Sequence, residues 1–172
     1  GNRYATFHQL GKEQAQKLHE DDRLYDVGDT IFIGSTPLGN SSLSLYLREY
    51  HDNALSMYPA IGNVKEGRLP EEAIEIALSE DALQYLGLDA VIGDTVSLDL
   101  SVSVMDGSLS ELEYSADFVL TGILESSYIG YASGTVEGIV GEGTAEELLP
   151  EEYLLYSTDF KTYDKQNFQS II

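Results

Sequence analysis

The three histidines are the side chains best suited to general acid–base catalysis or to metal binding. His8, His19 and His51 are far apart in the sequence, and none has a second histidine three or four positions further on. A zinc site needs three or four converging ligands, so this spacing predicts no metal site. The chain contains no cysteine, which excludes disulfides, thiol nucleophiles and cysteine-based metal sites.

Neighbouring acidic residues form four small groups, at positions 20–22, 71–72, 146–147 and 151–152. Glycoside hydrolysis needs two carboxyl groups that face each other across a cleft, and adjacent acids on a surface turn do not provide this. The segment from 21 to 29 lacks the ligand spacing of an EF-hand, and no lysine follows the glycine-rich stretch at 138–143 in the manner of a phosphate-binding loop. We therefore expect no catalytic residue, no cofactor and no enzyme activity.

Tyrosine is the abundant aromatic residue, with 12 copies and no tryptophan. Tyr128 and Tyr131 stand in a glycine-flanked segment and are the candidate ligand contacts for a peptide or a sugar. Tyrosines on strands more often cover a face of a sheet, which is the alternative interpretation of the other copies.

The charge balance restricts the partners of the chain. Thirty acidic residues against nine lysines and arginines give a formal net charge of −21. Such a field repels phosphate backbones, so nucleic acid is excluded as a partner, whereas cationic peptides remain compatible. The longest uncharged stretch, from 30 to 47, contains Pro37 and two glycines, so we do not expect it to cross a membrane.

The elements that must position these residues follow from hydrophobic periodicity. Alternation of apolar and polar residues predicts strands at 3–9, 23–35, 42–50, 75–78, 95–105, 111–124, 135–140 and 152–160. Helices are expected after Gly11, from the cap Ser79 to the stop at Gly87, at 144–149 and from Asp164 onwards. The segments at 52–59 and 61–70 are predicted as one helical turn and a loop.

This order predicts an α+β fold, with a βαβ-type lobe formed by both chain ends and an inserted, mainly antiparallel β lobe. We expect a single domain over 1–172, with lobe A at about 1–50 plus 150–172 and lobe B at about 51–149. The last helix is predicted to be still running at Ile172, so we expect the sequence to stop inside a structural unit.

Several motifs occur in a family-like order. From Glu75 to Val96 a short strand leads into the Ser79-capped helix, then Leu-Gly, then Gly-Asp before the next strand; further motifs are Tyr4-Ala5-Thr6-Phe7-His8, Gly67-Arg68-Leu69-Pro70 and Phe118-Val119-Leu120-Thr121-Gly122-Ile123. This order resembles the extracytoplasmic core domain of FtsX-like and MacB-like ABC transporter permeases, in particular Gram-positive members. The segment from 127 to 143 departs from the family pattern.

The resemblance implies an ectodomain on the extracellular side of the cell membrane, between transmembrane helices of the same permease, with ATP hydrolysis on a separate cytoplasmic subunit. It implies coupling of transmembrane motion to recognition of a substrate or partner: a cationic peptide, an envelope lipid or an envelope protein. Two alternatives remain open. The first is a free-standing secreted or lipid-anchored binding protein, and the second is an extracellular hydrolase with a carboxylate site.

Overall fold

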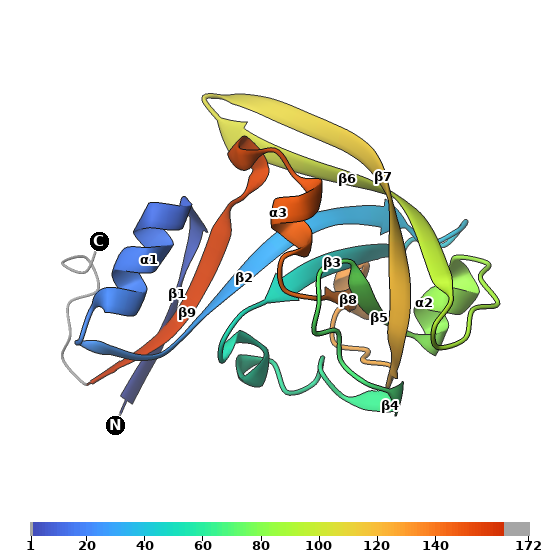
Figure 1. Cartoon of the computed structure of the whole chain (residues 1–172), viewed down its shortest axis with the longest axis horizontal. Coiled ribbons are helices and arrows are strands. Elements are labelled where there is room, and N and C mark those ends of the chain that lie inside the picture. The colour runs from blue at the N-terminus through green and yellow to red at the C-terminus, as the bar shows by residue number, and fades with distance from the viewer. Residues whose placement is uncertain (1, 164–172) are drawn as a thin grey trace.

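A nine-stranded sheet is the main element of the computed structural model, which describes residues 2–163 (Figure 1). Neighbouring strands follow the order β1-β9-β2-β3-β8-β5-β7-β4, and β6 pairs with β2 and β7. The strands are β1 (Asn2–Leu10), β2 (Leu24–Pro37), β3 (Ser44–Tyr50), β4 (Val64–Gly67), β5 (Glu75–Ser79), β6 (Thr95–Asp106), β7 (Ser108–Leu124), β8 (Thr135–Val140) and β9 (Tyr156–Tyr163). Helical elements between them are α1 (Lys12–Glu20), η1 (Ala54–Met57), α2 (Glu80–Tyr85), η2 (Tyr131–Ser133), α3 (Thr144–Leu148) and η3 (Glu151–Tyr153).

The two chain ends build one βαβ unit. Strand β9 lies between β1 and β2 and is antiparallel to both, so β1 and β2 run parallel and α1 connects them. Ala15 and Leu18, three positions apart, turn the buried face of α1 toward this part of the sheet. This arrangement confirms the predicted α+β class and the lobe formed from both ends.

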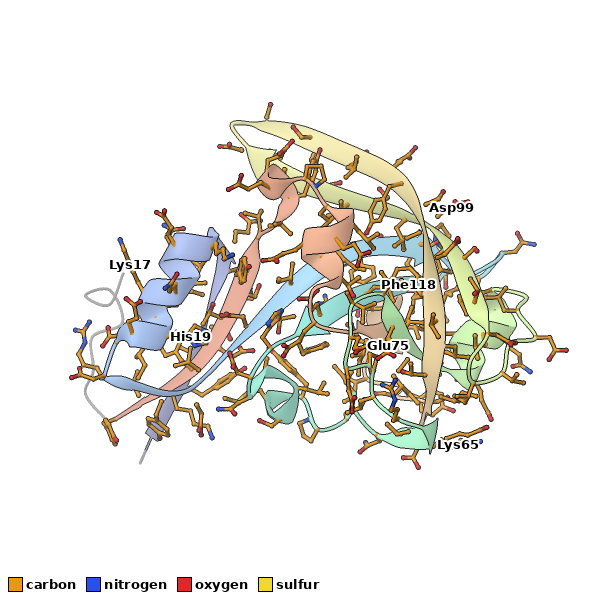
Figure 2. All side chains as sticks on the ribbon, viewed as in Figure 1. Lys17, His19, Lys65, Glu75, Asp99 and Phe118 are labelled. Atoms are coloured by element: carbon orange, nitrogen blue, oxygen red, sulfur yellow. The ribbon has the colours of Figure 1, made fainter. Side chains whose placement is uncertain are left out.

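The inserted part is dominated by the β6–β7 hairpin. The two strands pair antiparallel from Thr95 opposite Val119 to Asp106 opposite Ser108, and Gly107 makes the turn with a positive φ of 73°. Alternate residues of β6 are buried, as the sequence predicts, and on β7 Phe118 is fully buried (Figure 2). The proposed division into lobes A and B stays a prediction, since the hydrogen-bonded sheet continues from one to the other.

The helix that follows β5 forms as predicted. The Ser79 side chain accepts a hydrogen bond from the Ala82 amide at 3.2 Å, and Gly87 follows the helix with a φ of 71°. Leu83 is buried in the core, and the C-cap residue Leu86 is half-buried.

Two boundaries differ from the predictions. The expected loop at 61–70 contains the short strand β4, whose mostly exposed residues leave no alternation to detect. The strand expected at 152–160 begins only at Tyr156, because a 3-10 turn after Pro150 bonds the Tyr153 amide to the Pro150 carbonyl at 2.9 Å. The helix expected from Asp164 lies outside the described residues.

A charged pair, Arg68 and Glu75, stabilises the connection between β4 and β5; we call it the clamp. The Arg68 guanidinium donates two hydrogen bonds to the Glu75 carboxylate, at 2.9 and 2.6 Å. The amides of Glu71 and Glu72 donate to the same carboxylate at 2.9 and 3.0 Å. The hydrogen bonds from Arg68, followed by those from the backbone, lower the pKa of Glu75 to about 2, so the clamp is charged at neutral pH.

We predict that this clamp contributes to the acid stability of the fold. The folded pKa lies below the usual value of about 4.3, so the contribution is complete above pH 4.3 and is lost as the pH falls toward 2. Glu75→Gln should lower the free energy of unfolding by about 1–3 kcal/mol at pH 7 and weaken its dependence on pH in this window. Urea denaturation at several pH values measures both effects.

Glu71→Gln is the matched control, because the exposed Glu71 carboxylate lies 4.0 Å from Arg68 and makes only a weak ion pair. Equal stability loss in the two variants at pH 7 would contradict the assignment.

Candidate functional site

The predicted ligand-contact tyrosines lie in the loop between β7 and β8. Their rings meet edge to face, with centroids 4.9 Å apart and planes at 77°. The Tyr131 hydroxyl donates to the Asp81 carboxylate on α2 at 2.7 Å. Burial, and then this hydrogen bond, raise the pKa of Tyr131, so it remains a neutral donor. Tyr131 thus anchors the loop to α2, while Tyr128 is 68% exposed to solvent.

An apolar cavity of about 330 Å³ lies beside this loop, at the edge of the sheet where β5 and β7 end and β8 begins. Three segments line it: residues 57–61 after η1, the end of the sheet, and the loop with the start of β8. The lining residues are Met57, Tyr58, Pro59, Ala60, Ile61, Ser79, Leu124, Glu125, Ser127, Ile129, Gly130, Thr135, Val136 and Glu137. Neither predicted tyrosine is among them, although their neighbours Ile129 and Gly130 are.

The lining of this cavity is mostly apolar. Its charged lining residues, Glu125 and Glu137, are acidic. Glu137 forms an ion pair with Arg48, whose guanidinium lies 5.5 Å from the rings of Phe32 and Tyr46. Such a site fits an apolar group that carries or adjoins a positive charge.

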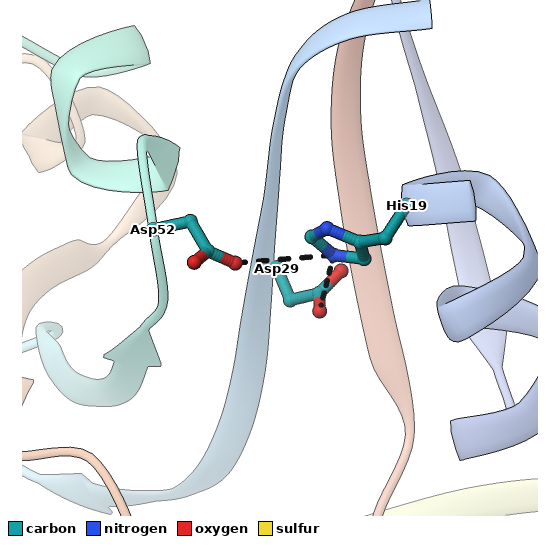
Figure 3. Close-up of side chains that lie close together, drawn as sticks. All are labelled: His19, Asp29 and Asp52. Carbon is teal, nitrogen blue, oxygen red and sulfur yellow. Dashed lines mark hydrogen bonds and ion pairs between the residues drawn. The ribbon is translucent and has the colours of Figure 1, made fainter. Parts of the chain in front are cut away.

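His8 lies apart from the other two histidines, whereas His19 and His51 line one cavity. His8 contacts Ser157 at 3.1 Å on the surface, and His51 pairs with the buried Glu49, whose hydrogen bond raises the pKa of His51. His19 lies 2.9 Å from Asp29 and 3.9 Å from Asp52 (Figure 3). The sequence reasoning missed this last group, because its members are 10 and 23 positions apart and only the tertiary fold brings them together.

Comparison with known proteins identifies the fold. No family model and no curated protein sequence matches this chain. Among solved structures, it is similar to the extracellular domain of the noncanonic ABC-type transporter YknZ from Gram-positive bacteria, with a TM-score of 0.61 and 11% identity over 99% of this chain and 88% of that one. It is also similar to the periplasmic region of MacB from Actinobacillus actinomycetemcomitans, with a TM-score of 0.53 and 15% identity over 95% of this chain and 70% of that one.

This chain has the MacB-type ectodomain fold. The likeness confirms the resemblance that the order of the motifs indicates. Within the MacB-type fold those motifs serve close packing. A Cβ atom on Gly122 would come within 2.3 Å of the Arg68 carbonyl oxygen, and one on Gly67 within 2.2 Å of that of Thr121. Glycine at both positions therefore lets β4 approach β7.

We predict that the apolar cavity binds a neutral apolar probe such as N-phenyl-1-naphthylamine. Ile129 lines the cavity but is 79% exposed, so a charge there should leave the fold intact. Ile129→Asp should weaken probe binding about fivefold, which corresponds to the loss of roughly 1 kcal/mol of apolar contact. Fluorescence titration measures the affinity.

Val91→Asp is the control, because Val91 is 62% exposed and does not line the cavity. The assignment fails if both variants bind the probe as tightly as the parent chain.

Proposed function

We propose that this chain is the extracytoplasmic domain of an FtsX-like or MacB-like ABC transporter permease, and that it couples transmembrane motion to recognition outside the membrane. The observation that carries this proposal is the likeness to the YknZ extracellular domain over 99% of the chain. Within residues 2–163, no helix has both the length and the apolar character needed to cross a bilayer.

The recognition surface in this proposal is the apolar cavity together with the exposed Tyr128. A cationic peptide with an apolar side chain suits it, because the cavity is aliphatic and the net charge of the chain is −21. An envelope lipid or an envelope protein are the other occupants we consider. Nucleic acid is excluded by charge.

The partners in this proposal are the transmembrane helices of the same permease and a separate cytoplasmic ATPase subunit. The chain itself would perform no catalysis, and the similar solved structures, both from transporters, favour this over an extracellular hydrolase. A free-standing secreted or lipid-anchored binding protein could use the same cavity, and it would differ from a permease in having no transmembrane helices.

Cysteine labelling of the full-length gene product in intact cells tests the proposal. These 172 residues contain no cysteine. Any cysteine elsewhere in the gene product would be replaced by serine, so that a single substitution gives an unambiguous signal. Leu109, at the tip of the β6–β7 hairpin, is 64% exposed. We expect Leu109→Cys to react with a membrane-impermeant maleimide in intact cells, and the labelled protein to stay in the membrane after a carbonate wash.

Ala82→Cys is the control, because Ala82 is fully buried and should react only after denaturation. Labelling of Leu109→Cys only after the cells are permeabilised would place the domain in the cytoplasm and refute the proposal. Labelled protein in the culture medium or in the carbonate wash would favour the secreted alternative.

A further inference from the structure

His19, Asp29 and Asp52 converge on one point from three elements (Figure 3). His19 lies in the last turn of α1, Asp29 on β2, and Asp52 in the turn between β3 and η1. One ligand atom from each lies within 4.8 Å of the other two. We propose that these three side chains bind a divalent transition-metal ion, with Zn²⁺ as the best fit.

The distances suit a small ion with mixed nitrogen and oxygen ligands. In a tetrahedral zinc site the ligands lie about 2.0–2.2 Å from the metal, and hence roughly 3.3 Å from each other. The His19 Nε2 atom is 2.9 Å from Asp29 Oδ2 and 3.9 Å from Asp52 Oδ2, on either side of that value. Shifts of about half an ångström would bring these two distances to the tetrahedral value, and the Asp29 and Asp52 oxygens lie within 4.8 Å of each other. The imidazole selects Zn²⁺ over Ca²⁺ and Mg²⁺, which prefer oxygen ligands.

The Asp29 carboxylate is already oriented for this role. It is buried, and its Oδ1 atom accepts a hydrogen bond from the buried Thr158 hydroxyl on β9 at 2.7 Å, which leaves Oδ2 directed at His19. The His51 amide donates to the Asp29 carbonyl at 2.8 Å and so holds the turn that contains Asp52 against β2. Such outer hydrogen bonds orient the ligands of natural metal sites.

The three side chains line one wall of a cavity of about 330 Å³ that also includes Gln16, His51 and Glu146. This space leaves room for water in the remaining coordination position. Lys12 also lines the cavity, but it pairs with Glu146 at 3.4 Å and its charge is offset there. The acidic surface raises the local concentration of cations.

Metal binding would connect α1 to the segment that leads to the apolar cavity. Asp52 is followed directly by η1 and by residues 57–61, which form one wall of that cavity. An ion held by His19 and Asp52 would fix this segment to the βαβ unit. Zn²⁺ binding by these three ligands does not depend on whether the chain belongs to a transporter.

Calorimetric titration of the metal-free chain with ZnCl₂ tests the site, with Asp52→Asn and His19→Gln as variants. Asp52 is 59% exposed at its side chain, so its replacement should not disturb folding. We expect one Zn²⁺ per chain, an affinity at least about tenfold weaker in each variant, and a Zn²⁺-dependent rise in Tm of the parent chain only. Asp22→Asn is the control, because Asp22 is an exposed acid in the connection between α1 and β2. This variant should bind Zn²⁺ like the parent chain.

Titration with Ca²⁺ in the same experiment is the comparison. Three outcomes would each overturn the proposal: no Zn²⁺ binding at millimolar concentrations, equal Zn²⁺ affinity of the parent chain and Asp52→Asn, or tighter binding of Ca²⁺ than of Zn²⁺. Without Zn²⁺ binding, His19 and Asp29 would remain a hydrogen-bonded pair only.

Discussion

Within residues 2–163, the carboxylates of Asp29, Glu49 and Asp159 are buried, although the net charge of the chain is −21. The donors that satisfy them come mostly from segments far apart in the sequence. A buried carboxylate without partners costs several kcal/mol, so each one must collect hydrogen bonds. Glu49 on β3 accepts from the amides of Gly143 and Ala145, at 3.1 and 2.8 Å. It thereby places the N-terminus of α3 against the sheet, while the His51 ring contacts the same carboxylate.

The other two buried acids connect the βαβ unit to the apolar cavity and to the group of His19, Asp29 and Asp52. Asp159 on β9 accepts hydrogen bonds from Tyr4 and Thr6 on β1 and from Tyr58, which lines the apolar cavity. Asp29 joins β9 through Thr158 and meets His19 on α1. The same requirement, to satisfy buried negative charge, therefore holds the chain ends together and fixes the wall of the cavity.

Local patterns in the sequence predict the parts of the fold that local physics controls. The alternation in β6 and β7 and the cap at Ser79 need only neighbouring residues, and both elements form where the sequence places them. By contrast, β4 has too few buried residues to show a pattern. The Tyr128–Tyr131 loop is recognisable from its aromatic and glycine content, and whether it contacts a ligand stays a prediction.

The long-range parts of the site have no local signal. The apolar cavity needs residues 57–61 to lie beside the ends of β5 and β7 and the start of β8, a consequence of pairing across more than forty positions. The group of His19, Asp29 and Asp52 likewise depends on β2 lying between β9 and β3. Spacing along the chain carries no trace of either arrangement.

ATP hydrolysis by the assembled complex is the most direct test of the proposed role in an ATP-driven permease. The full-length gene product would be purified from membranes through an affinity tag in mild detergent. We expect an ATP-hydrolysing subunit to co-purify with it in a fixed ratio and the complex to hydrolyse ATP. Folded, membrane-extracted protein that carries no ATPase under these conditions would refute the permease proposal.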